Sequence, residues 1–347
     1  MTRVSICLLP LWLVACAPLA ARTEVTPAAA VSPAAEKHPG MNALIAEMAP
    51  EDAARRAALT ELMQAAEYQQ AIIDAISRPA EAKPWHQYRP IFMTDERIRQ
   101  GLAFWREHRE LLQTVETEFQ VPAEYIVSIV GVETFYGRVT GRWKVLDALT
   151  TLGLYYPPRQ AYFRGELMRF LDLPKTRGIE IDQRKVTGSY AGAMGLGQFM
   201  PTSFVKWAVD QDDDGQIDLW NSRADALASV ANYLKDHGWA YGERVTVPMV
   251  PGPNAKAWSD PGLDPVYTVG TLVEWGYQPE IVLAPETPAS LLRLEVASGE
   301  YEYHAIFPNF RVITRYNRSP LYAMAVHELA LALRAGMDTP AVAGSAP

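Results

Sequence analysis

Cysteine is nearly absent from this sequence, whose 347 residues include only Cys7 and Cys16. Both lie close to the N-terminus, inside a segment that has the features of a targeting signal. If Cys16 is acylated there, the mature protein contains no free thiol and no disulfide. Thiol catalysis and zinc sites built from cysteine are then excluded, and the fold must be stabilised by packing or by another kind of crosslink.

Positive charge is also scarce. Lys and Arg number 32 against 40 Asp and Glu, which gives a formal net charge of −8. Arg3 is the only charged residue before Cys16, so the balance from there on is 31 − 40 = −9. Because no basic run is present to neutralise phosphates, nucleic-acid binding is disfavoured. The overall field does not attract an acidic substrate either, so any such attraction must be local to a groove.

The apolar run at the N-terminus, Ile6–Val14, is too short for a membrane span. With Arg3 before it and a cleavage site after it, the run predicts a signal peptide over residues 1–15. Leu13–Cys16 resembles a bacterial lipobox, in which the cysteine becomes the lipidated first residue of the mature protein. A plain secretory signal with an incidental cysteine is the alternative.

Residues 16–40 are rich in Ala, Pro, Ser and Thr, which predicts a tether between a lipid anchor and the folded part. Ala17 rather than Asp follows Cys16, and in enteric bacteria this pattern implies sorting to the outer membrane. The expected location is therefore the periplasmic face of the outer membrane, with the protein held there as a lipoprotein.

Two familiar catalytic signatures are missing as well. No Ser/His/Asp hydrolase elbow is visible, and the six histidines show no metal-ligand pairing. Apolar residues, in contrast, make up 49% of the chain, and Trp, Tyr and Phe number 9, 16 and 10. This composition indicates a folded globular protein rather than a disordered one.

Helical spacing of apolar residues dominates the chain, and the predicted fold class is α+β, mainly helical. Helices are predicted at 42–77, 94–119, 145–153, 159–171, from Pro201, at 222–236 and at 319–336, with an extended connection at 84–90. Period-two runs at 291–296 and 301–307 flank Ser298-Gly299 and predict a β-hairpin. The predicted division is an α domain at 41–118, a core at 119–243, a small β domain at 244–316, a C-terminal helix at 317–336 and a loose tail at 337–347.

Glu133 is the only carboxylate on the apolar side of a helix predicted between Pro122 and Gly137. Ile129, Val130 and Glu133 recur at three- and four-residue spacing, so they share one face. A carboxyl group on a buried face loses hydration, its pKa rises, and it can serve as a general acid near neutral pH. The alternative is a buried Glu that is held by an Arg or by backbone donors.

An acidic loop at 210–225 has the spacing of an EF-hand-like cation site. Asp residues stand at loop positions 1, 3 and 5, followed by Gly215, and this pattern favours calcium. Asn221 stands at position 12, where a bidentate Glu is usual, so Asp225 would have to close the site. The candidate ligands are Asp210, Asp212, Asp214, Gln216 and Asp225. A solvated acidic turn that caps the next helix is the alternative, and a bound ion would stabilise the fold rather than signal.

Four glycines in the segment 188–203 allow its backbone to approach either a ligand or a neighbouring helix, and the sequence leaves both open. Ser189, Tyr190 and Gln198 lie between them and offer hydroxyl, aromatic and amide groups suited to a sugar. The spacing fits neither a dinucleotide site nor a phosphate loop, and no Lys is present for a phosphate.

Six motifs follow one another in an order typical of one family. They are Val130-Gly-Val-Glu-Thr-Phe-Tyr-Gly137, Tyr156-Pro-Pro-Arg-Gln-Ala-Tyr-Phe163, Gly192-Ala-Met-Gly-Leu-Gly-Gln-Phe-Met-Pro201, the acidic loop with Leu219-Trp220, Ala231-Asn-Tyr-Leu234 and Arg315-Tyr-Asn-Arg318. Over residues 42–336 the chain closely resembles the membrane-bound lytic murein transglycosylases of the B type. The resemblance implies a lysozyme-like catalytic core, a flanking α domain, a small β domain and one calcium loop.

Carried over by position, the resemblance implies that Glu133 is the catalytic acid and base. It implies groove residues at Ser189, Gln198, Tyr162, Arg159, Tyr316 and Asn317. One departure is Pro158 before Arg159, where the family has a second Arg, so one cationic contact is missing.

The implied reaction is cleavage of the β-1,4 bond between N-acetylmuramic acid (MurNAc) and N-acetylglucosamine (GlcNAc) without water, which leaves 1,6-anhydro-MurNAc ends. A hydrolytic muramidase on the same scaffold and a non-catalytic peptidoglycan-binding lipoprotein are the alternatives. The expected partners are glycan strands of peptidoglycan and proteins of cell-wall synthesis or remodelling, and no nucleic acid is expected.

Overall fold

The computed structural model describes residues 36–78 and 83–339. The predicted signal peptide, Cys16, the tether up to residue 35 and the tail from residue 340 lie outside the described residues. From Lys37 onward the chain forms one compact unit. Among the described helices, none is both long enough and apolar enough to cross a membrane.

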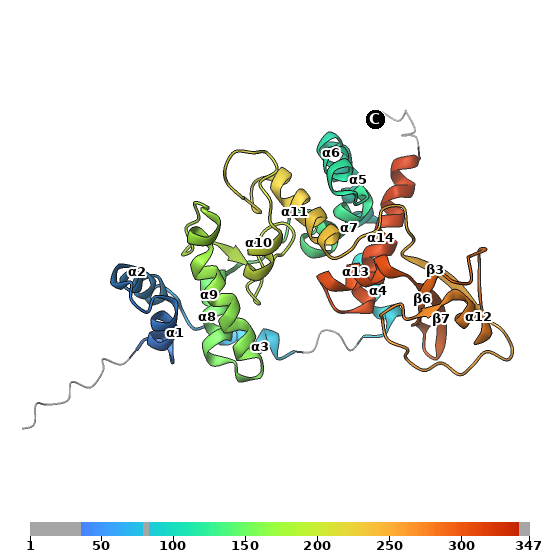
Figure 1. Ribbon diagram of the computed structural model, residues 1–347, viewed down its shortest axis with the longest axis horizontal. Coiled ribbons are helices and arrows are strands. Elements are labelled where there is room, and N and C mark those ends of the chain that lie inside the picture. Colours follow the sequence, from blue (N-terminus) through green and yellow to red (C-terminus); the bar gives the residue numbers. More distant parts are fainter. Residues whose placement is uncertain (1–35, 79–82, 340–347) are drawn as a thin grey trace, which may run out of the picture. The chain divides into compact units, whose positions relative to one another are not determined.

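Helices make up most of this unit (Figure 1). Their bounds are α1 Met41–Met48, α2 Ala53–Gln64, α3 Gln70–Ile76, α4 Trp85–Phe92, α5 Asp95–Glu107, α6 Arg109–Phe119, α7 Ala123–Thr134, α8 Val145–Tyr155, α9 Gln160–Arg177, α10 Pro201–Trp207, α11 Arg223–Asp236, α12 Val269–Glu274, α13 Pro308–Tyr316 and α14 Pro320–Asp338, with a 3-10 turn, η1, at Pro157–Arg159. The strands are β1 Trp143–Lys144, β2 Thr187–Gly188, β3 Thr246–Pro251, β4 Tyr267–Thr268, β5 Tyr277–Pro279, β6 Pro288–Ala297 and β7 Glu300–Ile306. The prediction of a mainly helical α+β fold is confirmed.

Helix α7 is the centre of the arrangement and packs against α14, α11, α5 and α6. Pro122 is its N-cap, in extended conformation, as expected for a residue that cannot donate a backbone hydrogen bond. The helix stops at Thr134, whereas Gly137 was predicted to lie just past its last turn. It stops there because Phe135 and Tyr136 take left-handed φ values of 50° and 60°.

The prediction of an extended segment at 84–90 is wrong, because this part of the chain forms α4. Pro84 lies outside the helix as its N-cap, whereas Pro90 lies inside it. Trp85 is buried and stacks on Tyr88, which in turn contacts Phe92 at a ring distance of 5.2 Å. This packing of aromatic rings at helical spacing offsets the hydrogen bond that Pro90 cannot make.

The remaining helical predictions hold with changed boundaries. The pattern at 42–77 divides into α1, α2 and α3, and Asp52 caps α2. Thr94, the first residue of the helix predicted at 94–119, caps α5, but this helix ends at Glu107, and α6 begins at Arg109 after His108. Helix α9 continues through Pro174 to Arg177, six residues beyond the predicted end at 171.

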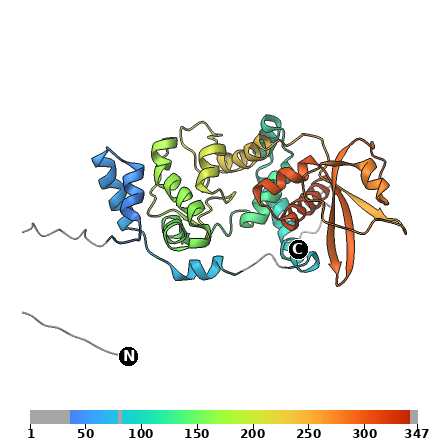
Figure 2. The ribbon, with the colours of Figure 1, turned by 60° about the horizontal axis from the view of Figure 1, so that its bottom comes forward.

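The predicted hairpin is confirmed as β6 and β7, which pair antiparallel (Figure 2). They form the middle of a five-stranded sheet in the order β4-β6-β7-β3-β5. Successive residues of β6 point to opposite faces. Leu291 joins a small apolar cluster with α12, while Leu292 and Leu294 join the large cluster of the helices. The prediction for this region did not include α12 or α13.

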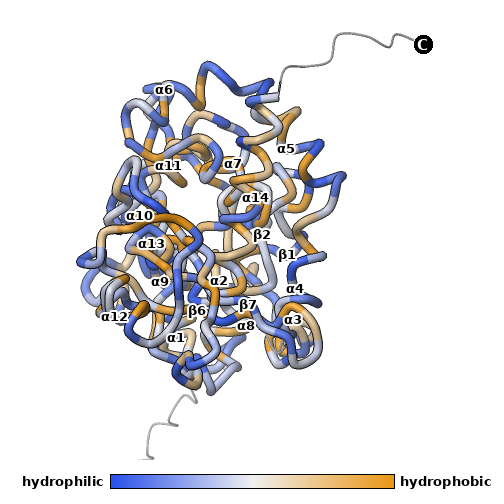
Figure 3. The backbone as a smooth tube through the Cα atoms, turned by 90° about the vertical axis from the view of Figure 1, so that its right-hand side faces the viewer, coloured by the Kyte–Doolittle hydropathy of each residue, from blue (hydrophilic) through white to orange (hydrophobic). Residues whose placement is uncertain are grey.

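The large apolar cluster runs through most of the helices, from α1 to α14. Along these helices apolar stretches alternate with polar ones, as the colours of Figure 3 show. The cluster includes the buried side chains of α7 and α14, so the helix that carries Glu133 has a fixed place in the core.

Candidate active site

Glu133 lies in the last turn of α7, where the helix leaves the core. Every residue from Tyr125 to Gly131 is buried, so the helix is enclosed on nearly all sides rather than along one apolar stripe. Glu133 itself is half-buried. Its carboxyl group is therefore largely removed from water but still accessible to a ligand.

The carboxyl group of Glu133 has one polar partner among the described residues. The hydroxyl of Tyr322 donates a hydrogen bond of 2.6 Å to its Oε1. Burial raises the pKa of Glu133 from 4.5 to about 7, and the hydrogen bond from Tyr322 opposes this rise. In the described part of the chain no Arg, Lys or backbone N–H pairs with this carboxyl group. The alternative of a buried Glu held by an Arg or by backbone donors therefore does not apply to Glu133.

Tyr322 lies in the first turn of α14, which Ser319 caps. Its role was not visible in the sequence, because Tyr322 and Glu133 are 189 residues apart. The Ser319-Pro320 start signal does place Tyr322 in the first turn of the last helix, but it does not show which element that turn faces.

Tyr316, at the end of α13, also lies beside the acid. Burial raises its pKa well above the ordinary value, and the charge of Glu133 adds to this effect. Its hydroxyl donates a 2.6 Å hydrogen bond to the backbone carbonyl of Gly197. A Cβ at Gly197 would lie 2.9 Å from this hydroxyl, so the glycine permits close packing. At this position the glycine segment serves packing, one of the two alternatives left open by the sequence.

Gln198 follows directly and takes a left-handed φ of 52°. Its side-chain amide donates to the carbonyl groups of Thr140 at 3.1 Å and Gly195 at 3.0 Å. The hydroxyl of Thr134 donates to the carbonyl of Leu196, which ties the segment to the end of α7. Glu133, Tyr316 and Gln198 are thus brought together by the fold.

Ser189 stands at the other end of the glycine segment. Its Oγ accepts hydrogen bonds from the N–H groups of Ala191 at 3.3 Å and Ala193 at 3.0 Å. Within residues 36–78 and 83–339 no acceptor takes the proton of this hydroxyl, and the side chain is half-buried. Ser189 can therefore donate to a ligand.

Arg159 and Tyr162 lie on η1 and the start of α9. The guanidinium of Arg159 stacks over the Tyr162 ring at 4.7 Å, and 43% of Tyr162 is exposed. The charge of Arg318 acts on the pKa of Tyr162, which places the pair near the residues after α13. Asn317 accepts the N–H of Ser319 at 3.2 Å and so fixes the start of α14. No contact between described residues joins Arg159 to Glu133.

The acidic loop brings Asp210, Asp212 and Asp214 together, with one carboxylate oxygen of each within 4.8 Å of the others. Asp210 also accepts the N–H groups of Asp214 at 3.2 Å and Gly215 at 2.9 Å, so the loop curls around its own first residue. Crowded carboxylates on a tight loop are the oxygen donors that a hard cation prefers. The three residues therefore fit a calcium ion.

Asp225 and Gln216 are placed differently. The carboxylate of Asp225 accepts the N–H groups of Gln211 and Asp218, both at 2.8 Å, and it is not a member of the described cluster. The side chain of Gln216 accepts the N–H of Glu180 at 2.8 Å. Asp225 thus holds the two ends of the loop together, and the side-chain oxygen of Gln216 is directed to the backbone of Glu180.

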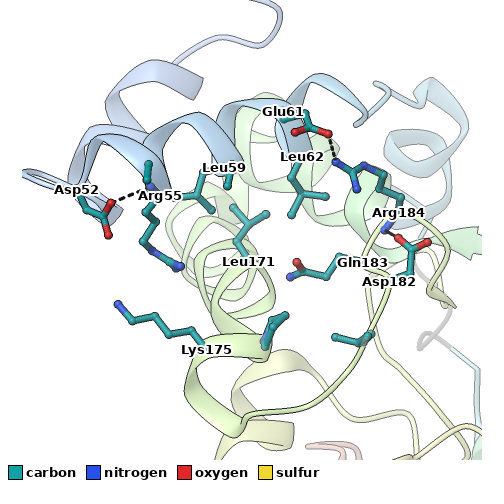
Figure 4. A pocket seen from close by; sticks show the side chains of 14 residues that line it. Asp52, Arg55, Leu59, Glu61, Leu62, Leu171, Lys175, Asp182, Gln183 and Arg184 are labelled. Carbon is teal, nitrogen blue, oxygen red and sulfur yellow. Dashed lines mark hydrogen bonds and ion pairs between the residues drawn. The ribbon is translucent and has the colours of Figure 1, made fainter.

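A cavity of about 790 Å³ lies away from α7, between α2, α9 and the segment 181–184 (Figure 4). Leu59, Leu62 and Leu171 form its apolar wall. At one side Glu61 pairs with Arg184 at 2.8 Å, so the charges there neutralise each other. Neither Glu133 nor its neighbours Tyr322 and Tyr316 line this cavity.

A family model described as "Transglycosylase SLT domain" matches residues 36–331. The chain belongs to this family. It is 44% identical over 250 residues to the membrane-bound lytic murein transglycosylase B of Escherichia coli (strain K12). The aligned part covers 72% of this chain and 67% of that protein.

Solved structures agree with this assignment. The soluble lytic transglycosylase SltB1 from Pseudomonas aeruginosa is similar with a TM-score of 0.79 and 44% identity, over 87% of this chain and 100% of that one. The Escherichia coli lytic transglycosylase Slt35 in complex with calcium is similar with a TM-score of 0.78 and 37% identity, over 86% and 94%. The predicted family is confirmed: the protein is a lytic murein transglycosylase, an enzyme that acts on peptidoglycan.

Proposed function

We propose that Glu133 carries out the whole reaction as the only catalytic carboxyl group, first as acid and then as base. Its protonated carboxyl donates to the oxygen that bridges MurNAc C1 and GlcNAc, and the C1–O bond breaks through an oxocarbenium-like state. The carboxylate then removes the proton of the MurNAc C6 hydroxyl, whose oxygen bonds to C1. The proton returns to Glu133, and a 1,6-anhydro ring replaces the broken bond without water.

The observation that carries this proposal is the state of the Glu133 carboxyl. With a pKa raised to about 7 by burial, it holds its proton over a pH range in which an exposed Glu has lost it. Ordinary glycosidases place a second carboxyl group about 5–9.5 Å away. No other carboxyl group in the described residues acts on the pKa of Glu133, which supports a mechanism with a single acid.

The hydroxyl of Tyr322 would fix the orientation of Glu133 and stabilise its carboxylate after the first proton transfer. Around this pair we assign sugar contacts to Ser189, Gln198, Tyr162, Arg159, Tyr316 and Asn317. Three features support the assignment: the free hydroxyl proton of Ser189, the exposed face of Tyr162 and the contact of Tyr316 with the glycine segment. Tyrosine rings suit the apolar faces of sugars.

We also propose that calcium binds the acidic loop through Asp210, Asp212 and Asp214, with Asp225 holding the loop ends. The crowding of three carboxylates supports this, and the similar Slt35 was solved in complex with calcium. The ion would stabilise the loop before α11 and supplies no step of the chemistry.

For the rest of the chain we propose the division made from the sequence: an α domain at 41–118, a core at 119–243, a small β domain at 244–316 and a returning helix at 317–336. Lipidation of Cys16 would hold the enzyme at the periplasmic face of the outer membrane, where glycan strands and wall-remodelling proteins are its partners. The name of the membrane-bound Escherichia coli relative supports such an anchor.

Digestion of purified sacculi tests the mechanism. The form that begins after Cys16 should release fragments with 1,6-anhydro ends, each one water lighter by mass spectrometry than a hydrolytic product. Glu133→Gln should release none while still binding sacculi, and Glu51→Gln, the same change at an exposed site before α2, should leave the activity intact. Fragments with reducing ends would instead show a muramidase, and a wild type that releases nothing would show a binding protein.

A further inference from the structure

The loop that follows the catalytic turn, residues 138–142, carries two arginines that have no polar partner among the described residues. Arg138 and Arg142 are exposed, and neither forms an ion pair or a side-chain hydrogen bond with any described residue. Each guanidinium lies near an aromatic ring of its own segment, Arg138 at 5.9 Å from Phe135 and Arg142 at 5.4 Å from Trp143. Because stacking uses only the face of a guanidinium, the N–H groups at its edge remain available.

This loop lies directly against the residues assigned to the sugar groove. Gly141 has a φ of 101°, and a Cβ there would lie 2.0 Å from the carbonyl of Gly188 and 2.5 Å from the N of Ser189. The side chain of Gln198 donates to the carbonyl of Thr140 at 3.1 Å. The backbone between Arg138 and Arg142 therefore contacts both Ser189 and Gln198.

The loop is also fixed relative to the acid. The N–H of Val139 donates to the carbonyl of Thr134, the residue after Glu133, at 2.9 Å. The hydroxyl of Thr134 accepts the N–H of Gly137 at 3.1 Å. Arg138 thus follows Glu133 by five residues on a turn that the end of α7 holds in place.

Two other arginines near this turn, Arg97 and Arg223, are engaged. Arg97 donates to the carbonyl of Gly131 and lies between the rings of Phe92 and Phe135. Arg223 donates to the carbonyl of Trp220 at 3.4 Å. Glu96, whose pKa the charge of Arg138 lowers only slightly, pairs instead with Arg99 at 2.6 Å.

Two free guanidinium groups at a sugar groove are conspicuous in a chain with a net charge of −8. Each can bind a carboxylate through paired N–H groups. In peptidoglycan, carboxylates are carried by the stem peptide attached to MurNAc, not by the sugars of the glycan backbone. We propose that Arg138 and Arg142 bind carboxylates of the stem peptide on the glycan being cleaved. This inference rests on the proposed function and names the part of the substrate that the loop recognises.

The test compares two soluble substrates. One is glycan strands with intact stem peptides, released from sacculi by an endopeptidase. The other is the same strands stripped by an amidase and then treated with carbodiimide and ammonia, which converts the lactyl carboxylates exposed by the amidase to neutral amides. Arg138→Gln with Arg142→Gln should raise KM on the peptide-bearing strands about four- to 25-fold, the product of two exposed ion pairs of about two- to fivefold each. KM on stripped strands and kcat on both substrates should stay unchanged. Arg56→Gln, an exposed arginine on α2, is the matched control.

Two further measurements keep the outcome clear. The pair Arg138→Lys and Arg142→Lys keeps the charge and should recover part of the loss, while circular dichroism shows that all variants are folded. Added salt should raise the wild-type KM on peptide-bearing strands more than on stripped strands. An equal loss on both substrates, or no loss on either, overturns the assignment. Failure of the proposed function is distinguishable, because wild type would then form no anhydro ends from either substrate.

Discussion

Replacing Glu133 by Gln should make the stability of the protein less dependent on pH. Gln keeps the shape of the side chain and can still accept the hydrogen bond from Tyr322, but it does not titrate. In the wild type, burial raises the pKa of Glu133 from 4.5 to about 7. Between these values the folded state binds more protons than the unfolded state, so the unfolding free energy falls as the pH rises through this window.

The size of this effect follows from the pKa values. A rise from 4.5 to about 7 corresponds to about 3 kcal/mol at 1.36 kcal/mol per unit. Relative to the wild type, Glu133→Gln should therefore gain about 3 kcal/mol between about pH 4 and about pH 8. Other titrating groups cancel in the difference between the two proteins.

Guanidinium unfolding of both proteins across this range, followed by fluorescence, measures the difference. Glu51→Gln controls for the loss of an exposed charge. A difference that stays constant with pH would refute the reasoning, because the carboxyl of Glu133 would then titrate alike in the folded and unfolded states. A difference of opposite sign would mean that the site stabilises the carboxylate.

Three other changes test separate parts of the structure. Tyr322→Phe removes the hydrogen bond that lowers the pKa of Glu133, so the alkaline limb of the kcat/KM profile should move to higher pH; movement to lower pH would contradict this. Removing calcium with a chelator should lower the Tm of the wild type by a few degrees but not that of Asp212→Asn, and equal sensitivity of both would exclude the loop as the site. Gly141→Ala places a Cβ 2.0 Å from the Gly188 carbonyl at a left-handed φ. It should lower the free energy of unfolding, measured in urea, by at least about 1–3 kcal/mol. An unchanged free energy of unfolding would contradict the packing described.

Local signals were sufficient to predict that Glu133 is shielded from water and where its helix starts. Pro122 marks the beginning of α7, and the apolar periodicity around Glu133 indicates burial. The end of the helix was not predictable, because it depends on distant contacts. The Tyr136 ring fills space that a Cβ at Gly101 or Gly131 would occupy, and it packs on Phe104 at 5.6 Å. That packing holds two bulky residues in the left-handed region, at about 1–2 kcal/mol each.

Contacts between residues far apart in the sequence also explain the other differences between prediction and structure. Helix α4 forms through Pro90 because Trp85 is buried in the core, which local propensity does not show. Tyr322 reaches Glu133 through the docking of α14 on α7, a contact between distant parts of the sequence. Asp225 has the right position in the sequence to close the acidic loop, yet its carboxylate is taken by backbone N–H groups.

Titration of the Glu133 carboxyl by carbon-13 NMR tests the central claim most directly. The signal is identified by its loss in Glu133→Gln, and the form that begins after Cys16 is used without substrate. The expected result is a pKa of about 7. A value near 4.5, that of an ordinary Glu, would mean that the side chain holds no proton at neutral pH and that the single-acid mechanism is wrong.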